Sequence, residues 1–103
     1  MFARLPAMDT SPFANGAAYL RGRYVPIAEA SIPVTDWGFT RSDAVYDVVH
    51  VFKNGFFRLD DHLDRFLRSM AARRLSPSED KAQIETALHR CAALPMPMSR
   101  WWR

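Results

Sequence analysis

The sequence predicts a small α+β domain in which two helices pack on an antiparallel β-ribbon. Three observations support this fold class. Residues 45–52 are rich in β-branched side chains, and Asn54-Gly55 directly after them is a strong signal for a two-residue hairpin turn. Apolar residues recur at helical spacing after Asp60. A second helical segment follows Ser76, where the sequence resembles a helix N-terminus.

The sequence of the N-terminal part predicts an irregular arm over residues 1–16, followed by a small hairpin. Apolar residues at 17–20 and 24–25 flank Gly22, where the hairpin is expected to turn.

The next segment is expected to lack regular pairing. Two prolines interrupt residues 27–35, which predicts an extended or looped course. A turn with two large aromatic side chains follows, in which Gly38 is expected to supply a positive φ. The ordinary interpretation of Trp37 and Phe39 is packing in the core.

The central ribbon has a definite expected register. A turn at Asn54-Gly55 pairs Phe52 with Phe57. One face then carries Tyr46, Val48, His50, Phe52, Phe57 and Leu59. The other carries Val45, Asp47, Val49, Val51, Lys53, Phe56 and Arg58. Both faces contain apolar residues, so the ribbon is expected to be covered on both sides.

Two helices complete the fold. Asp60 or Asp61 is expected to cap the first. Its predicted buried stripe consists of Leu63, Phe66, Leu67, Met70, Ala71 and Leu75. For the second helix, Ser76 is the expected cap, Pro77 the first residue, and Glu79 the partner in a capping box. The apolar face of that helix carries Ile84, Leu88 and Cys91.

Composition limits the classes of function. A chain of 103 residues is one domain or part of one, and its 49% apolar and 24% charged residues are ordinary for a globular protein. The net charge of +3 comes mainly from scattered arginines, which argues against a nucleic-acid interface. No apolar run is long enough to span a membrane. The single cysteine, Cys91, fits a reducing compartment, so a cytoplasmic location is expected.

The residues alone suggest no self-evident catalytic group. Arg65 lies opposite the apolar stripe, which is typical of a solvated residue, and His62 flanks the stripe. The carboxylates of Asp60, Asp61 and Asp64 could suggest a metal site, but their position in a first helical turn favours a helix-dipole role. No glycine-rich phosphate loop, metal-ligand cluster or nucleophile elbow is present, and no metal is expected.

Three motifs in order resemble a known family. These are IPVTDWGFTRSD at residues 32–43, YDVV at 46–49 and RLDDHLDR at 58–65. Together they resemble the N-terminal region of the class IV (fold-type IV) enzymes that use pyridoxal 5'-phosphate (PLP). That group includes branched-chain and D-amino acid aminotransferases, aminodeoxychorismate lyases and (R)-selective amine transaminases. The similarity runs from about residue 17 to residue 92, and its motifs look most like the (R)-selective branch.

The resemblance implies roles for four residues. The family's arginine at the position of Arg65 contacts the cofactor phosphate, a task that suits a planar, permanently charged fork. The strand residues at the positions of Tyr46 and Val48 limit the size of the substrate's side group. Arg41 would lie near the entrance of the pocket.

The resemblance also implies an activity and its partners. Such enzymes are homo-oligomers that transfer an amino group from an amine or amino acid to a 2-oxo acid. Their Schiff-base lysine belongs to a C-terminal domain, and neither Lys53 nor Lys81 matches it, so no catalytic residue is assigned here. Residues 17–93 are therefore interpreted as an incomplete N-terminal domain. Residues 94–103 look unlike the family and suggest a truncated or frame-shifted product that is inactive alone.

Two other interpretations stay open at this point. The chain could be a non-catalytic fragment that self-associates or pairs with a full-length aminotransferase through exposed apolar surface. The Arg-Trp-Trp-Arg end, at residues 100–103, could instead bind nucleic acid or a membrane surface, because aromatic side chains beside arginines stack on bases or lie at a lipid interface.

Overall fold

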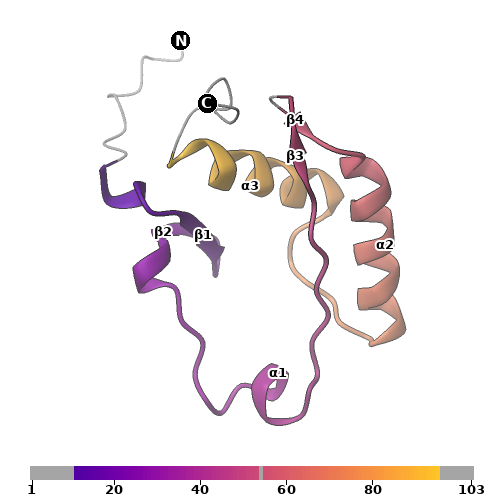
Figure 1. Ribbon diagram of the computed structural model, residues 1–103. Coiled ribbons are helices and arrows are strands. Elements are labelled where there is room, and N and C mark those ends of the chain that lie inside the picture. The colour runs from indigo at the N-terminus through magenta and orange to yellow at the C-terminus, as the bar shows by residue number, and fades with distance from the viewer. Residues whose placement is uncertain (1–10, 54, 96–103) are drawn as a thin grey trace.

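The computed structural model describes residues 11–53 and 55–95 and confirms the α+β class (Figure 1). The tail at 96–103 and the first ten residues of the expected arm lie outside the described residues, as does Asn54. The elements in chain order are η1 (Ser11–Phe13), β1 (Ala17–Leu20), β2 (Arg23–Pro26), η2 (Ile27–Glu29), α1 (Trp37–Thr40), β3 (Val51–Phe52), β4 (Gly55–Phe56), α2 (Leu59–Ala72) and α3 (Lys81–Ala93).

The N-terminal hairpin forms as expected and rests against α3. Strands β1 and β2 pair antiparallel, with Leu20 opposite Arg23, and Gly22 in the turn has a φ of 79°. Tyr19 on β1 links this hairpin to the segment that precedes α3, because its hydroxyl donates to Oε2 of Glu79 over 3.0 Å. That hydrogen bond raises the pKa of the Tyr19 phenol.

The segment after the hairpin runs away from the helices to α1, at the far end of the molecule (Figure 1). Asp36 caps α1, since its Oδ1 accepts a 2.7 Å hydrogen bond from the amide of Gly38. The expected positive φ at Gly38 is therefore wrong, because a residue in the first turn of a helix takes helical angles. Core packing of Trp37 and Phe39 is also wrong for this chain, because both are exposed.

Residues 43–52 return toward the helices as an extended segment. Their side chains alternate between half-buried and exposed, as a strand requires. Among the described residues, pairing is confined to the end of the segment, where β3 pairs with β4 and the carbonyl of His50 accepts a 2.7 Å hydrogen bond from the amide of Phe57. The expected register is wrong by two residues: Val51 pairs with Phe56 and Phe52 with Gly55. The left-handed φ of 49° at Lys53 places the turn one residue earlier than Asn54-Gly55.

The outward face of this segment is uncovered, contrary to expectation. Tyr46 is 85% exposed and Val48 is 70% exposed. Within the part of the chain that the structure describes, residues 44–49 take part in no backbone hydrogen bond. The ribbon is therefore covered on one side only, by α2 and α3.

Helix α2 begins after Arg58 rather than after an aspartate cap. Arg58 is the N-cap residue, has a left-handed φ of 54° and makes no capping bond, so a cap at Asp60 or Asp61 is wrong. Both carboxylates lie in the first turn and bind side chains instead: Asp61 pairs with Arg58 over 2.7 Å and Asp60 with Lys81 over 2.6 Å.

Helix α3 begins four residues later than the sequence suggests. A capping box forms between Asp80 and Gln83, whose side chains each accept a 2.8 Å hydrogen bond from the other's backbone amide. This reciprocal pair supersedes the expected cap at Ser76. Glu79 is left free to accept the hydrogen bond of Tyr19.

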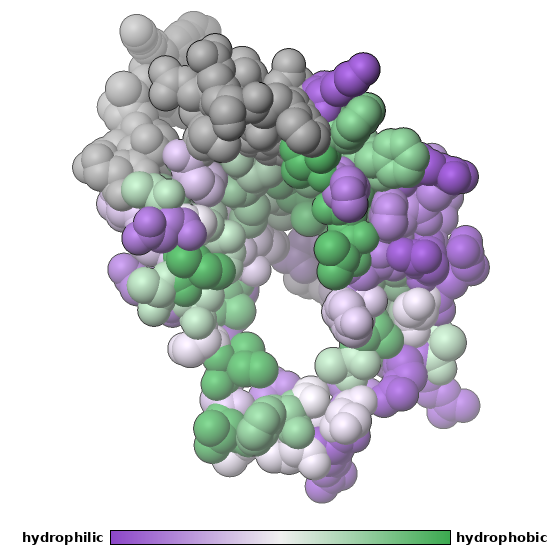
Figure 2. Space-filling model, viewed as in Figure 1, coloured by the Kyte–Doolittle hydropathy of each residue, from purple (hydrophilic) through white to green (hydrophobic). Residues whose placement is uncertain are grey.

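The core lies where α2, α3 and the hairpins meet, and it is thin. Among the described residues the buried hydrophobic side chains are Leu63, Met70, Ala87 and Leu94. Figure 2 shows an opening through the middle of this face, between the segment that follows β2 and the extended segment that leads to β3. No helix in the described part of the chain has both the length and the apolarity needed to cross a bilayer.

Candidate anion-binding site

A carboxylate, an imidazole and a guanidinium meet where the extended segment runs beside α2 (Figure 1). Arg65 donates to Asp47 through two parallel hydrogen bonds, from Nε to Oδ2 and from Nη2 to Oδ1, each 2.7 Å long. Nδ1 of His62 lies 2.9 Å from the same Oδ1. Because an ionised carboxylate can only accept, His62 donates to Asp47 from Nδ1.

Helical spacing and strand alternation bring these groups together. His62 and Arg65 are three residues apart on α2 and so project from neighbouring positions on one face, with Ser69 one turn further along. Asp47 projects from the half-buried side of the extended segment, toward that face.

The ion pair shifts the pKa values of both Asp47 and Arg65. Hydrogen bonds from Arg65 and then from His62 hold the pKa of Asp47 well below its usual range, against the opposing effect of desolvation. The hydrogen bond to Asp47 raises the pKa of Arg65 in turn. Asp47 is therefore a fixed negative charge at neutral pH.

An open hollow of about 460 Å³ lies beside the ion pair and is lined by Tyr46, Asp47, Val48, Arg65 and Ser69. Its volume is within the range of roughly 300–1,000 Å³ that is usual for small-molecule sites. Three of the four site residues suggested by the sequence, Tyr46, Val48 and Arg65, thus come together here. The fourth, Arg41, lies outside this hollow and stacks on Trp37, with its guanidinium carbon 4.3 Å from the ring centre.

Asp47 and Ser69 also belong to this site, although neither was predicted from the sequence. A signal for Asp47 was present, because it is a lone carboxylate inside an otherwise apolar run and such a group requires a partner. Ser69 carried no comparable signal beyond its spacing of four residues from Arg65.

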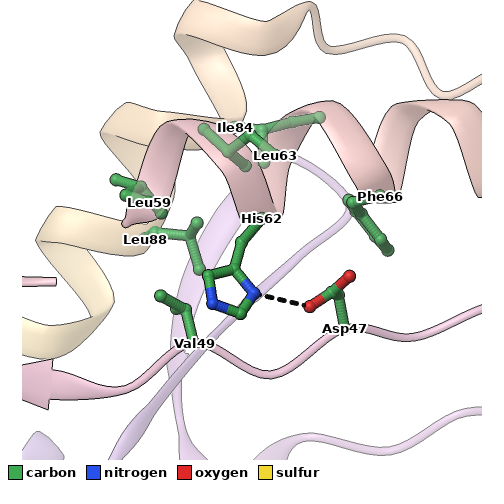
Figure 3. A pocket seen from close by; sticks show the side chains of 8 residues that line it. All are labelled: Asp47, Val49, Leu59, His62, Leu63, Phe66, Ile84 and Leu88. Atoms are coloured by element: carbon green, nitrogen blue, oxygen red, sulfur yellow. Dashed lines mark hydrogen bonds and ion pairs between the residues drawn. The ribbon is translucent and has the colours of Figure 1, made fainter. Parts of the chain in front are cut away.

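A second, more enclosed cavity of about 120 Å³ lies on the other side of His62 (Figure 3). Its walls are apolar apart from Asp47 and His62, and the remaining lining residues are Val49, Leu59, Leu63, Phe66, Ile84 and Leu88. In Figure 3 one ring nitrogen of His62 faces Asp47 and the other faces Val49. This cavity is a gap in the core rather than a polar ligand site.

Arg65 retains the means to bind an anion. A guanidinium carries five N–H groups, and Asp47 takes one from Nε and one from Nη2. The side chain of Arg65 is 59% exposed. A phosphate group suits the remaining fork, because planar paired donors match phosphate oxygens.

The described residues give less support to a metal site or to a reactive lysine. No group of three or more His, Cys, Asp or Glu side chains within residues 11–53 and 55–95 could hold a metal ion. Lys81 is bound by Asp60 over 2.6 Å and by Asp64 over 2.9 Å, and these hydrogen bonds raise its pKa. It remains a charged link between α2 and α3.

Two curated proteins are similar to part of this chain. A stretch of 51 residues, 50% of the chain, is 33% identical to the D-alanine aminotransferase of Staphylococcus aureus (strain N315). About half of the chain is distantly similar to D-alanine aminotransferases. A second relative, the D-alanine aminotransferase of Bacillus licheniformis, is 28% identical over 67 residues, or 65% of the chain. No protein-family model matches the chain.

The similarity supports the resemblance to class IV PLP enzymes in part. D-alanine aminotransferases have the class IV fold and use PLP. The matched stretches span only 18% and 24% of the length of these two relatives. Activity, substrates and partners of a whole aminotransferase are therefore proposals for this chain.

The Asp47 ion pair predicts a loss of stability in acid. A carboxylate with a depressed pKa in the folded state stabilises the fold above its unfolded pKa of about 4, and this contribution disappears as the pH falls below that value. We expect the melting temperature to fall as the pH is lowered below about 4. In Asp47→Asn the melting temperature should fall less over the same pH interval. Thermal unfolding followed by circular dichroism between neutral and acidic pH measures both. Asp43→Asn is the matched control, because Asp43 makes only a 3.9 Å contact with Arg73; an equal effect of the two substitutions would contradict the prediction.

Proposed function

We propose that residues 17–93 form the phosphate-binding side of the PLP site of a class IV aminotransferase. The activity proposed for the whole enzyme is transfer of an amino group from an amine or amino acid to a 2-oxo acid. The observation that carries the proposal is that Tyr46, Val48 and Arg65 line one hollow, in which the Arg65 guanidinium keeps unused donors. The partial similarity to D-alanine aminotransferases favours D-amino acids among the possible donors.

Three residues of the hollow, and Arg41 outside it, have tasks in this proposal. Arg65 binds the phosphate end of the cofactor through its free N–H edge. Bound PLP supplies an electron sink for the substrate's α-carbon. Tyr46 and Val48 form a wall that limits the size of the substrate's side group and excludes water from one side. Arg41 lies at the end of α1, outside the hollow, which is compatible with a role at the entrance.

We assign no covalent step to these 103 residues. Lys81 stays an ammonium between two carboxylates, and an ammonium is not a nucleophile. Lys53 lies in the β3–β4 turn. The proposal for this chain is therefore binding and orientation of the cofactor phosphate.

The test compares PLP with pyridoxal, which lacks the phosphate. We expect PLP and inorganic phosphate, at millimolar concentration, to shift the NMR resonance of the Arg65 Nε–H group, because both offer phosphate oxygens. Pyridoxal at the same concentration should leave it in place. Equal shifts with PLP and pyridoxal, or no shift with either, would contradict the proposed function.

A further inference from the structure

Asp47 sets the orientation of the Arg65 guanidinium, and His62 in turn holds Asp47 in place. The side chain of Asp47 is 11% exposed, against 59% for Arg65. Asp47 also accepts a hydrogen bond from His62, whose ring lies against the core cavity. The carboxylate is thus the fixed member of the pair and the guanidinium the member that it orients.

The two hydrogen bonds to Asp47 use the side of the Arg65 guanidinium formed by Nε and Nη2. They use Nε and Nη2, so the N–H groups that remain are both of those on Nη1 and the second on Nη2. Nη2 also lies 3.3 Å from Nδ1 of His62. Because that nitrogen donates to Asp47, it cannot accept as well, and the second Nη2 proton stays available. The free groups form the outer end of the fork, which can bind two oxygens of one anion.

We propose that Asp47, held by His62, is a positioning residue that presents the outer edge of Arg65 to the phosphate of PLP. This inference rests on the proposed function and adds a residue that acts through Arg65. A flexible arginine must lose rotational freedom when it binds an anion, and part of that loss is already incurred in the Asp47 pair. The cost is the nearby negative charge of Asp47, which partly offsets the charge of Arg65.

The first measurement needs no substitution and no ligand. Rotation about the Cζ–Nε bond and exchange of the Nε proton, both measured by NMR, should be slow for Arg65 and fast for the exposed Arg68 on the same helix. Asp47→Asn should make Arg65 behave like Arg68, and Asp47→Glu should restore the slow behaviour in part. Equal mobility of Arg65 and Arg68 in the unsubstituted chain would overturn the inference, whatever the fate of the variants.

The second measurement is the affinity for inorganic phosphate, followed by isothermal calorimetry or NMR titration. We expect Asp47→Asn to weaken binding about threefold to tenfold, as loss of one pre-ordered side chain predicts. Asp43→Asn, a carboxylate on the same segment, should leave the affinity unchanged. Tighter binding by Asp47→Asn would show that Asp47 competes with phosphate, and would overturn the inference while the proposed function stands. A failure of the unsubstituted chain to bind phosphate would instead contradict the proposed function.

Discussion

Replacing Leu63 with alanine is expected to lower the free energy of unfolding by about 2–5 kcal/mol, as for other buried leucines. The side chain of Leu63 is 3% exposed. It lies on α2 and already borders a core cavity, so truncation would enlarge that cavity rather than let neighbours close over it. With only four buried hydrophobic side chains among the described residues, the chain has little stability to lose.

Urea unfolding followed by far-ultraviolet circular dichroism measures this loss. Leu67→Ala is the matched control, because Leu67 lies one turn along the same helix and is only half-buried. We expect its midpoint to fall by clearly less than that of Leu63→Ala. Equal midpoints for the two variants would mean that the contact between α2 and α3 does not depend on Leu63.

Replacing Arg65 with alanine is expected to reduce the affinity for PLP and for inorganic phosphate at least tenfold. A hydrogen bond to a charged group contributes roughly 1.5–3 kcal/mol, and the substitution removes a pair of them together with the positive charge. Calorimetric titration of the unsubstituted chain and of Arg65→Ala gives the two dissociation constants directly.

Two further variants sharpen this result. Arg68→Ala removes an exposed arginine from the same helix and should leave the affinity unchanged. Arg65→Lys keeps the charge but loses the fork, so an intermediate affinity is expected. If Arg65→Ala and Arg68→Ala weaken binding equally, the effect comes from net charge alone, and the hollow beside Asp47 is not the binding site.

The sequence predicted the helices better than it predicted their ends. The stripe containing Leu63 and Met70 is a property of helical spacing, and both residues are buried. The starts of the helices depended on competition between neighbouring polar residues. Asp80 superseded Ser76 because Gln83 completed a reciprocal pair with it. Asp60 lies inside the first turn of α2 and pairs with Lys81 of the other helix, a tertiary contact that local sequence does not reveal.

The candidate site also contains residues that the sequence predicted and a residue that it did not. The positions of Arg65, Tyr46 and Val48 came from a family resemblance, and the structure places all three beside one hollow. Asp47 escaped notice because alternation assigns it to the side opposite Tyr46. The hollow runs along the edge of the extended segment and so takes residues from both sides. The two-residue alternation of a strand predicts which side chains share a face. It does not predict which side chains meet at the edge of the strand.

The bare edge at residues 44–49 has a consequence for making and handling this protein. Its backbone amides and carbonyls are unengaged by any described residue and sit beside the exposed Tyr46 and Val48. Such an edge invites strand addition by other polypeptides. Concentrated samples should accordingly tend to precipitate.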